Sequence, residues 1–205
     1  MKTPQLKFKT LIFLLLVGFA FASCGNANKK EALVESRFLK NTEVWKITGD
    51  ANGGKGEQAE ASFDGGVQDG YIFAKDDAAG GTWYFSAPQA YLGDKSNFYG
   101  ATLNFNLFQH SAIKDQFENN DVIFKNGEKK ITYAFKNYPK QDWTAYSIPI
   151  DADNNWMKGN FNNEMPATKE DIKAVLSNVT EFWIRGEYES GGDEGGLDEV
   201  EITKN

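Results

Sequence analysis

The chain of 205 residues has one cysteine, Cys24, and one histidine, His110. A single cysteine excludes an internal disulfide, so the fold must be stable without that cross-link. A lone histidine excludes a histidine-ligated zinc site, and any Ser-His-Asp triad would have to use His110. Because His110 follows an expected strand at the start of a loop, we interpret it as a surface residue.

Positive charge is also scarce in this sequence. Lysine and arginine total 22 against 29 aspartate and glutamate residues, which gives a formal charge of −7. Residues 1–23 contain three of the lysines and no acidic residue, so the remaining chain carries a charge of −10. An acidic protein repels nucleic acids, because their binding depends on neutralisation of phosphates by lysine and arginine. We therefore expect no nucleic-acid partner.

The N-terminal apolar run, 11–22, is too short to span a bilayer, which takes roughly 20 residues. It follows a lysine-bearing start and ends in small residues, which is typical of a secretory signal peptide. The exit Ala22-Ser23-Cys24 resembles the lipobox of bacterial lipoproteins, in which the cysteine becomes the lipid-modified first residue. The alternative is ordinary secretory cleavage after Ala20-Phe21-Ala22, which would leave Cys24 as a free thiol.

These features predict three parts: a lipoprotein signal peptide over 1–23, a lipidated N-terminus and tether over 24–37, and one folded domain over 38–205. Residues 31–40 are expected to form a short helix or to belong to the tether. The lipid on Cys24 would hold the protein on a membrane of the cell envelope. We expect the outer membrane, with the domain facing the periplasm or the cell exterior.

The rest of the chain is rich in glycine and aromatic residues and lacks leucine-rich helical runs, which favours an all-β fold. Residues 101–109 alternate as a half-buried strand does, and Asn126-Gly127 predicts a hairpin between 122–125 and 130–135. One helix is expected over 168–178, capped by Thr168. Further strands are expected at 43–47, 70–73, 82–86, 143–150, 179–188 and 197–202. The pattern predicts a jelly-roll β-sandwich with one short helix.

Several segments, in order, resemble the laminin B domain (laminin domain IV type A). They are Gly81–Pro88, Tyr91–Asp94, Tyr99-Gly100, Leu176–Thr180, Ile184–Tyr188 and Leu197–Val200. The resemblance extends from about Phe38 to Ile202. It implies a jelly-roll, galactose-binding-like β-sandwich similar to carbohydrate-binding modules, without enzymatic activity.

Two strands carry the candidate ligand-binding residues. If Phe182 and Ile184 face the core, Trp183 and Arg185 share the outer face of their strand. The corresponding outer face of the 101–109 strand carries Asn104, Asn106 and Phe108. A flat aromatic ring beside arginine and asparagine suits a sugar, and exposed aromatic residues also bind protein partners. The alternative is an inverted register or a covering loop that buries Trp183.

A structural calcium ion is the one cofactor that the sequence suggests. Carboxylates cluster on the glycine-rich segment 191–199, and calcium prefers such hard oxygen ligands. By resemblance to jelly-roll binding modules, Asp198 and Asp50 are the expected ligands. The alternative is a solvated acidic loop without a metal.

The predicted function is that of a lipid-anchored, non-enzymatic recognition module outside the cytoplasm. Its expected partners are the membrane, through the lipid on Cys24, and a glycan or an envelope or extracellular protein. Two alternatives remain open. One is a glycan-processing hydrolase or its accessory subunit, since carboxylates are plentiful, and the other is a purely structural envelope protein.

Overall fold

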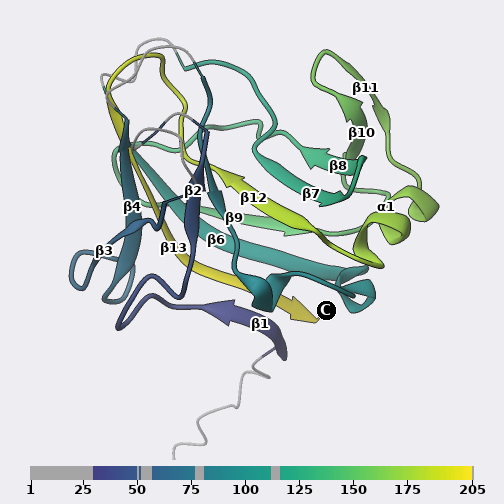
Figure 1. Ribbon diagram of the computed structural model, residues 1–205, viewed down its shortest axis with the longest axis horizontal. Helices are drawn as coiled ribbons and strands as arrows, with labels where there is room; N and C mark the ends of the chain where they lie inside the picture. Colours follow the sequence, from purple (N-terminus) through teal and green to yellow (C-terminus); the bar gives the residue numbers. More distant parts are fainter. Residues whose placement is uncertain (1–29, 50, 52–56, 77–80, 112–115, 205) are drawn as a thin grey trace, which may run out of the picture.

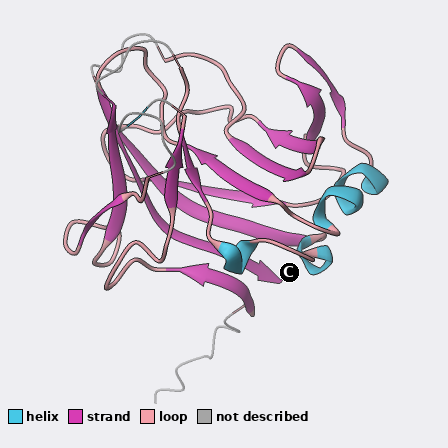
Figure 2. Ribbon diagram, viewed as in Figure 1, coloured by secondary structure: helices cyan, strands magenta, loops and turns pink. Residues whose placement is uncertain are grey.

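The computed structural model describes residues 30–49, 51, 57–76, 81–111 and 116–204. They form a β-sandwich of two antiparallel sheets with one α-helix, which confirms the predicted fold class (Figures 1 and 2). Cys24 and the leader over 1–23 lie outside the described residues. Within the described part, no helix is long and apolar enough to cross a membrane.

The first sheet has six strands and the second has seven. The order in the first is β3-β4-β13-β6-β9, with β1 also paired to β13, and the order in the second is β11-β10-β8-β7-β12-β5-β2. The strands of the first sheet are β1 (Ala32–Ser36), β3 (Glu60–Ser62), β4 (Tyr71–Asp76), β6 (Ala101–His110), β9 (Thr144–Pro149) and β13 (Asp193–Lys204). Those of the second are β2 (Lys46–Thr48), β5 (Tyr84–Ser86), β7 (Val122–Asn126), β8 (Lys129–Tyr133), β10 (Met157–Asn160), β11 (Asn163–Pro166) and β12 (Glu181–Arg185).

The hydrophobic core lies between the two sheets. From the first sheet, Leu103, Phe105 and Leu107 of β6 are buried, as their alternation predicts. From the second, Phe124 and Phe182 stack with their ring centres 4.3 Å apart. Edge-to-face and stacked ring contacts of this kind add stability beyond the apolar area that they bury.

Strand β13 is the longest strand and the centre of the first sheet. It pairs with β6 along one side, and with β4 and then β1 along the other. Its register shifts between Asp198 and Glu201, where Glu199 has a φ of 48°. A bulge of this type bends a strand and redirects its side chains.

The predicted helix and hairpin are both present. Helix α1 (Lys169–Leu176) begins with a complete capping box, in which Thr168 and Asp171 each bond the other's backbone N–H. It lies at the opposite end of the sandwich from β3 and β4 (Figure 1). Strands β7 and β8 pair around Gly127, whose φ of 56° is one that glycine adopts at low cost. Two 3₁₀ turns, η2 (Gln89–Tyr91) and η3 (Ser96–Phe98), connect β5 to β6.

The expected boundary of the domain at residue 38 is wrong. Residues Ala32–Ser36, which were expected in a helix or in the tether, form strand β1 of the first sheet. Val34 pairs with Ile202 and packs against the core. The sequence Ala-Leu-Val-Glu-Ser does not alternate apolar and polar residues, so only pairing with β13 defines this strand. The polar strands β3, β10 and β11 were also missed.

Arg185 is buried beneath the segment 116–121 and is therefore not exposed for ligand binding, contrary to the prediction. Its side chain is fully buried and pairs with the buried Asp121, with Nη1 3.2 Å from Oδ1. Its guanidinium also lies 4.4 Å from the ring centre of Phe117 and 4.3 Å from that of Tyr188. The pair therefore fastens the segment 116–121 to β12.

We expect Arg185→Met to lower the free energy of unfolding by about 3–5 kcal/mol at pH 7.5, because it leaves the buried Asp121 without its positively charged partner. The exposed pair of Lys75 and Glu194, 3.3 Å apart, provides the control. Lys75→Gln should cost less than about 1 kcal/mol. Urea unfolding measures both, and equal losses in the two variants would contradict the role given to Arg185.

Candidate functional site

The predicted ligand-binding residues lie on two different sheets. Asn104, Asn106 and Phe108 belong to β6 of the first sheet, whereas Trp183 belongs to β12 of the second. Their side chains point away from the core on opposite sides of the sandwich. The single binding face that combined them does not form.

Trp183 is on the outer face, as predicted, but its ring is already covered. The Lys125 ammonium lies 3.6 Å from the ring centre, and the Tyr84 ring lies 5.7 Å away. Lys125 is held in place by Glu181, 3.1 Å from its Nζ. A sugar would have to displace this cation–π contact, so Trp183 is poorly placed as a stacking platform.

Phe108 is only 5% exposed because it lies within an aromatic cluster on the outer face of the first sheet. Its ring centre is 5.5 Å from that of Tyr71, 4.7 Å from that of Trp143 and 4.3 Å from that of His110. Gly196 of β13 makes room for it, because a Cβ there would overlap the Phe108 ring. Phe108 therefore packs on its own sheet, and His110 is exposed beside it.

The segment 63–70 crosses this cluster between β13 and the start of β9. The Val67 backbone N–H donates to Asp198 Oδ2 over 2.7 Å, and the Trp143 indole N–H donates to the Gly65 carbonyl over 3.0 Å. Asp198 is 1% exposed beneath the segment, and burial raises its pKa to about 6. Asp198 thus clamps the segment onto the sheet.

The described residues around Asp198 do not fit the expected calcium site. Its other oxygen, Oδ1, accepts the Glu199 backbone N–H, so both oxygens already have a partner. Among the residues that the structure describes, no three histidine, cysteine, aspartate or glutamate side chains are grouped to hold a metal. The second expected ligand, Asp50, lies outside the described residues.

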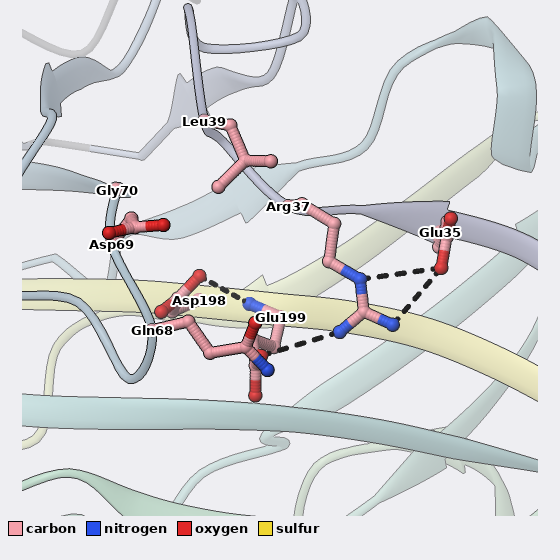
Figure 3. A pocket seen from close by; sticks show the side chains of 8 residues that line it. All are labelled: Glu35, Arg37, Leu39, Gln68, Asp69, Gly70, Asp198 and Glu199. Carbon is pink, nitrogen blue, oxygen red and sulfur yellow. Dashed lines mark hydrogen bonds and ion pairs between the residues drawn. The ribbon is translucent and has the colours of Figure 1, made fainter.

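Two adjoining pockets on the outer face of the first sheet form the candidate site. One, of about 380 Å³, is lined by Glu35, Arg37, Leu39, Gln68, Asp69, Gly70, Asp198 and Glu199 (Figure 3). The other, of about 310 Å³, is lined by Asn104, Asn106, Ser147 and Glu201 among others, and shares Arg37 and Glu199 with the first. We call the two together the sheet groove.

The bulge in β13 creates the first pocket. Strand β4 pairs with β13 as far as Leu197, and β1 resumes pairing only at Val200. On this side of β13, Asp198 and Glu199 therefore pair with neither β4 nor β1, and they line the pocket. The gap between the two ladders is the physical reason for a hollow at this position.

Arg37 lies at the junction of the two pockets. Its guanidinium is 3.0 Å from Glu35, 3.4 Å from Glu199 and 2.8 Å from Glu201. Glu35 comes from β1, Glu199 from the bulge itself and Glu201 from β13 just after it, so they hold the guanidinium in one place. Asn106 also donates to Glu199 over 3.5 Å, which links β6 to the same network.

Leu39 adds an apolar side chain at the rim of the groove, where it is 52% exposed. The segment that presents it has three non-glycine residues with positive φ: 55° at Phe38, 48° at Glu43 and 64° at Val44. Glu43 stabilises this backbone by accepting the N–H groups of Arg37 and Phe38. Strained backbone of this kind often occurs where a protein binds a ligand.

Sequence reasoning found Asn104 and Asn106 but missed Arg37, Glu35 and Glu201. The alternation of β6 identified the asparagines, whereas no local pattern indicates a bulge on a different strand. Arg37 was assigned to the tether because β1 was not recognised. Only the pairing of β1 with β13 brings it to Glu199 and Glu201.

Asp193, the first residue of β13, is another buried carboxylate. Asp193 accepts the Gln109 side-chain N–H and, over 3.4 Å, the Trp83 indole N–H. Burial raises the pKa of Asp193 to about 7, and it raises that of Asp121 to about 6, although Arg185 opposes the second shift. By contrast, the hydrogen bond from Lys158 lowers the pKa of Asp171 to about 2.

These pKa values give the stability of the fold a definite pH dependence. A raised pKa means that the folded chain holds the proton more tightly than the unfolded chain, so ionisation above the usual pKa costs stability. We expect the free energy of unfolding in urea to fall from pH 5 to pH 8, and Asp193→Asn to flatten that fall. Asp171→Asn is the control. The Asp171 carboxylate stays ionised from pH 5 to pH 8, so this variant should leave the dependence of the unfolding free energy on pH unchanged. A free energy of unfolding that rises over this range would contradict the assignment.

The fold is similar to that of known extracellular and carbohydrate-binding domains. The L4b domain of human laminin alpha-2 superposes with a TM-score of 0.64 at 14% identity, covering 84% of this chain and 98% of that one. A family 11 carbohydrate-binding module from a cellulosomal cellulase of Clostridium thermocellum gives a TM-score of 0.52 at 13% identity, covering 85% and 97%. A family 30 carbohydrate-binding module of another Clostridium thermocellum cellulosomal cellulase gives a TM-score of 0.52 at 16% identity, covering 84% of this chain and 98% of that one. At these identities the likeness establishes the jelly-roll fold alone.

Sequence comparison assigns the chain to a protein family. Mouse laminin subunit alpha-1 is 25% identical over 114 residues, which is 53% of this chain but 4% of that protein. The chain therefore spans only a small part of this relative. The family model described as laminin B (domain IV) matches residues 84–204, more than half of the sequence. The resemblance found in the sequence is thus confirmed, and the chain belongs to the laminin B (domain IV) family.

Proposed function

We propose that this chain is a non-enzymatic recognition module that binds a glycan in the sheet groove. The observation that carries the proposal is the groove itself, where charged, amide and hydroxyl side chains from four strands and two loops meet around Arg37. Asn104, Asn106 and Ser147 both donate and accept hydrogen bonds, as sugar hydroxyls do. Leu39 offers an apolar surface for the C–H groups of a sugar ring. The likeness to carbohydrate-binding modules supports the same function.

The state of the carboxylates favours binding over hydrolysis. A glycosidase needs one carboxyl group that donates a proton and a second that acts as a base or nucleophile. In the groove, Glu199 and Glu201 are paired with Arg37, and both oxygens of Asp198 accept backbone N–H groups. The protein itself holds these three carboxylates, and this favours a role in positioning a ligand over proton transfer to it.

We further propose that the module is held on a bacterial outer membrane by a lipid on Cys24. Each buried CH₂ of an acyl chain contributes about 0.8 kcal/mol to membrane binding. Only two residues precede β1 in the described part, and Cys24 lies six residues before Lys30. The domain would therefore stay near the membrane surface.

Glycan binding is tested with the full chain, purified in detergent, on a glycan array. We expect at least one glycan to bind, and Asn104→Ala and Asn106→Ala to weaken that binding at least fivefold, because each removes a hydrogen-bonding amide from the groove. Trp183→Ala, on the opposite sheet, is the matched control and should bind as the parent does. Circular dichroism checks that each variant is folded.

Two outcomes of this experiment would contradict the proposal. Loss of binding in Trp183→Ala, with the asparagine variants unaffected, would move the site to the second sheet. Release of reducing sugar from a bound polysaccharide would favour the hydrolase alternative.

Lipidation is tested by growing bacteria that express the chain with an alkyne-bearing fatty acid. We expect the parent chain to be labelled and recovered with the outer membrane, and Cys24→Ser to be unlabelled, because the thiol is the attachment point. A mature parent chain that begins at Ser23 and carries no label would show ordinary secretory cleavage instead.

A further inference from the structure

Two positively charged side chains on the outer face of the first sheet, Arg37 and Lys75, are paired with glutamates. Arg37 is shared among Glu35, Glu199 and Glu201. At the other end of the face, Glu194 lies 3.3 Å from Lys75. A ligand that approaches this face therefore meets cations whose charge is already compensated.

The sheet groove as a whole is acidic. Its lining contains one cation, Arg37, and five carboxylates, namely Glu35, Asp69, Asp198, Glu199 and Glu201. An anionic ligand would have to compete with three glutamates for Arg37 and would be repelled by the remaining carboxylates. The repulsion is strongest at low salt, because the screening length is about 30 Å at 0.01 M and about 10 Å at 0.1 M.

Resting on the function proposed above, we propose that the sheet groove selects uncharged, hydroxyl-rich glycans and rejects polyanionic ones. Hydroxyl groups donate hydrogen bonds to carboxylates, and such charge-assisted bonds are the stronger kind. A neutral polysaccharide thus satisfies the acidic lining without a charge of its own. Uronate or sulfate groups bring only acceptors to a surface that is already rich in acceptors.

Arg37 is the specificity-determining residue in this arrangement. A free guanidinium on a binding face would recognise carboxylate or sulfate with two parallel hydrogen bonds. Here the guanidinium N–H groups of Arg37 already face Glu35, Glu199 and Glu201, so Arg37 orients these glutamates and does not bind an anion. Proteins commonly gain specificity by placing charges that repel a competing ligand of the same sign.

Pairs of polysaccharides that share a backbone and differ in charge provide the test. They are hydroxyethyl cellulose against carboxymethyl cellulose, laminarin against sulfated laminarin, and dextran against dextran sulfate. The full chain is titrated with each at 20 mM and 500 mM salt, beside the glycan array. In any pair that binds, we expect the neutral member to bind at least tenfold tighter at 20 mM salt. Added salt should reduce that difference, because it screens the repulsion.

Two variants connect this selectivity to the groove. The double variant Glu199→Gln and Glu201→Gln releases Arg37 from two of its partners. It should reduce the ratio of neutral to anionic affinity at least threefold at 20 mM salt. Glu181→Gln removes one negative charge from the second sheet and should leave the ratio unchanged. If the double variant does not fold, the single variants Glu199→Gln and Glu201→Gln, each compared with Glu181→Gln, provide the same test.

The outcomes separate this inference from the function on which it rests. Tighter binding of the anionic member at 20 mM salt would overturn the inference and leave glycan binding intact. A ratio that the double variant and Glu181→Gln change equally would also overturn it, because the effect would then be one of net charge. No binding to any glycan, on the array or among the pairs, would overturn both proposals.

Discussion

The bulge in the central strand β13 is the constraint on which the candidate site depends. An uninterrupted strand would pair with a single neighbour along each side and would leave a flat outer face. Here the shift at Asp198 ends the pairing with β4 and starts the pairing with β1. The interruption produces a pocket, and it turns Asp198 and Glu199 towards different partners.

Stability and recognition use different parts of the sandwich. The core between the sheets combines aliphatic side chains with many aromatic rings, and the buried pair of Arg185 and Asp121 fastens a loop to the second sheet. The sheet groove, in contrast, is lined by polar side chains that are partly open to solvent. Substitutions in the groove therefore test binding without removing the interactions that hold the sheets together.

Several charged groups in this protein are arranged to limit one another. Arg37 is surrounded by three glutamates, and Asp198 is held by two backbone N–H groups. Such networks fix side chains at the cost of their availability for chemistry. The same feature that argues against hydrolysis supports a rigid surface for a neutral ligand.

Local patterns in the sequence were sufficient for a large part of the fold. The alternation of β6, the Asn126-Gly127 turn and the cap at Thr168 depend on neighbours within a few residues, and each is confirmed. The ordered laminin B motifs identified the family. Short or polar strands such as β1 and β10 were missed, since they are defined by pairing with distant segments.

The candidate site was only partly predictable. Asn104 and Asn106 follow from the alternation of one strand, but Trp183 and Arg185 were joined to them without knowledge of which strand belongs to which sheet. The sequence by itself determined the fold class, the family and the faces of the longest strands, because these depend on local periodicity. Only the tertiary structure decided that Arg185 is buried and that Arg37 meets Glu199 and Glu201, because both depend on contacts between segments far apart in the chain.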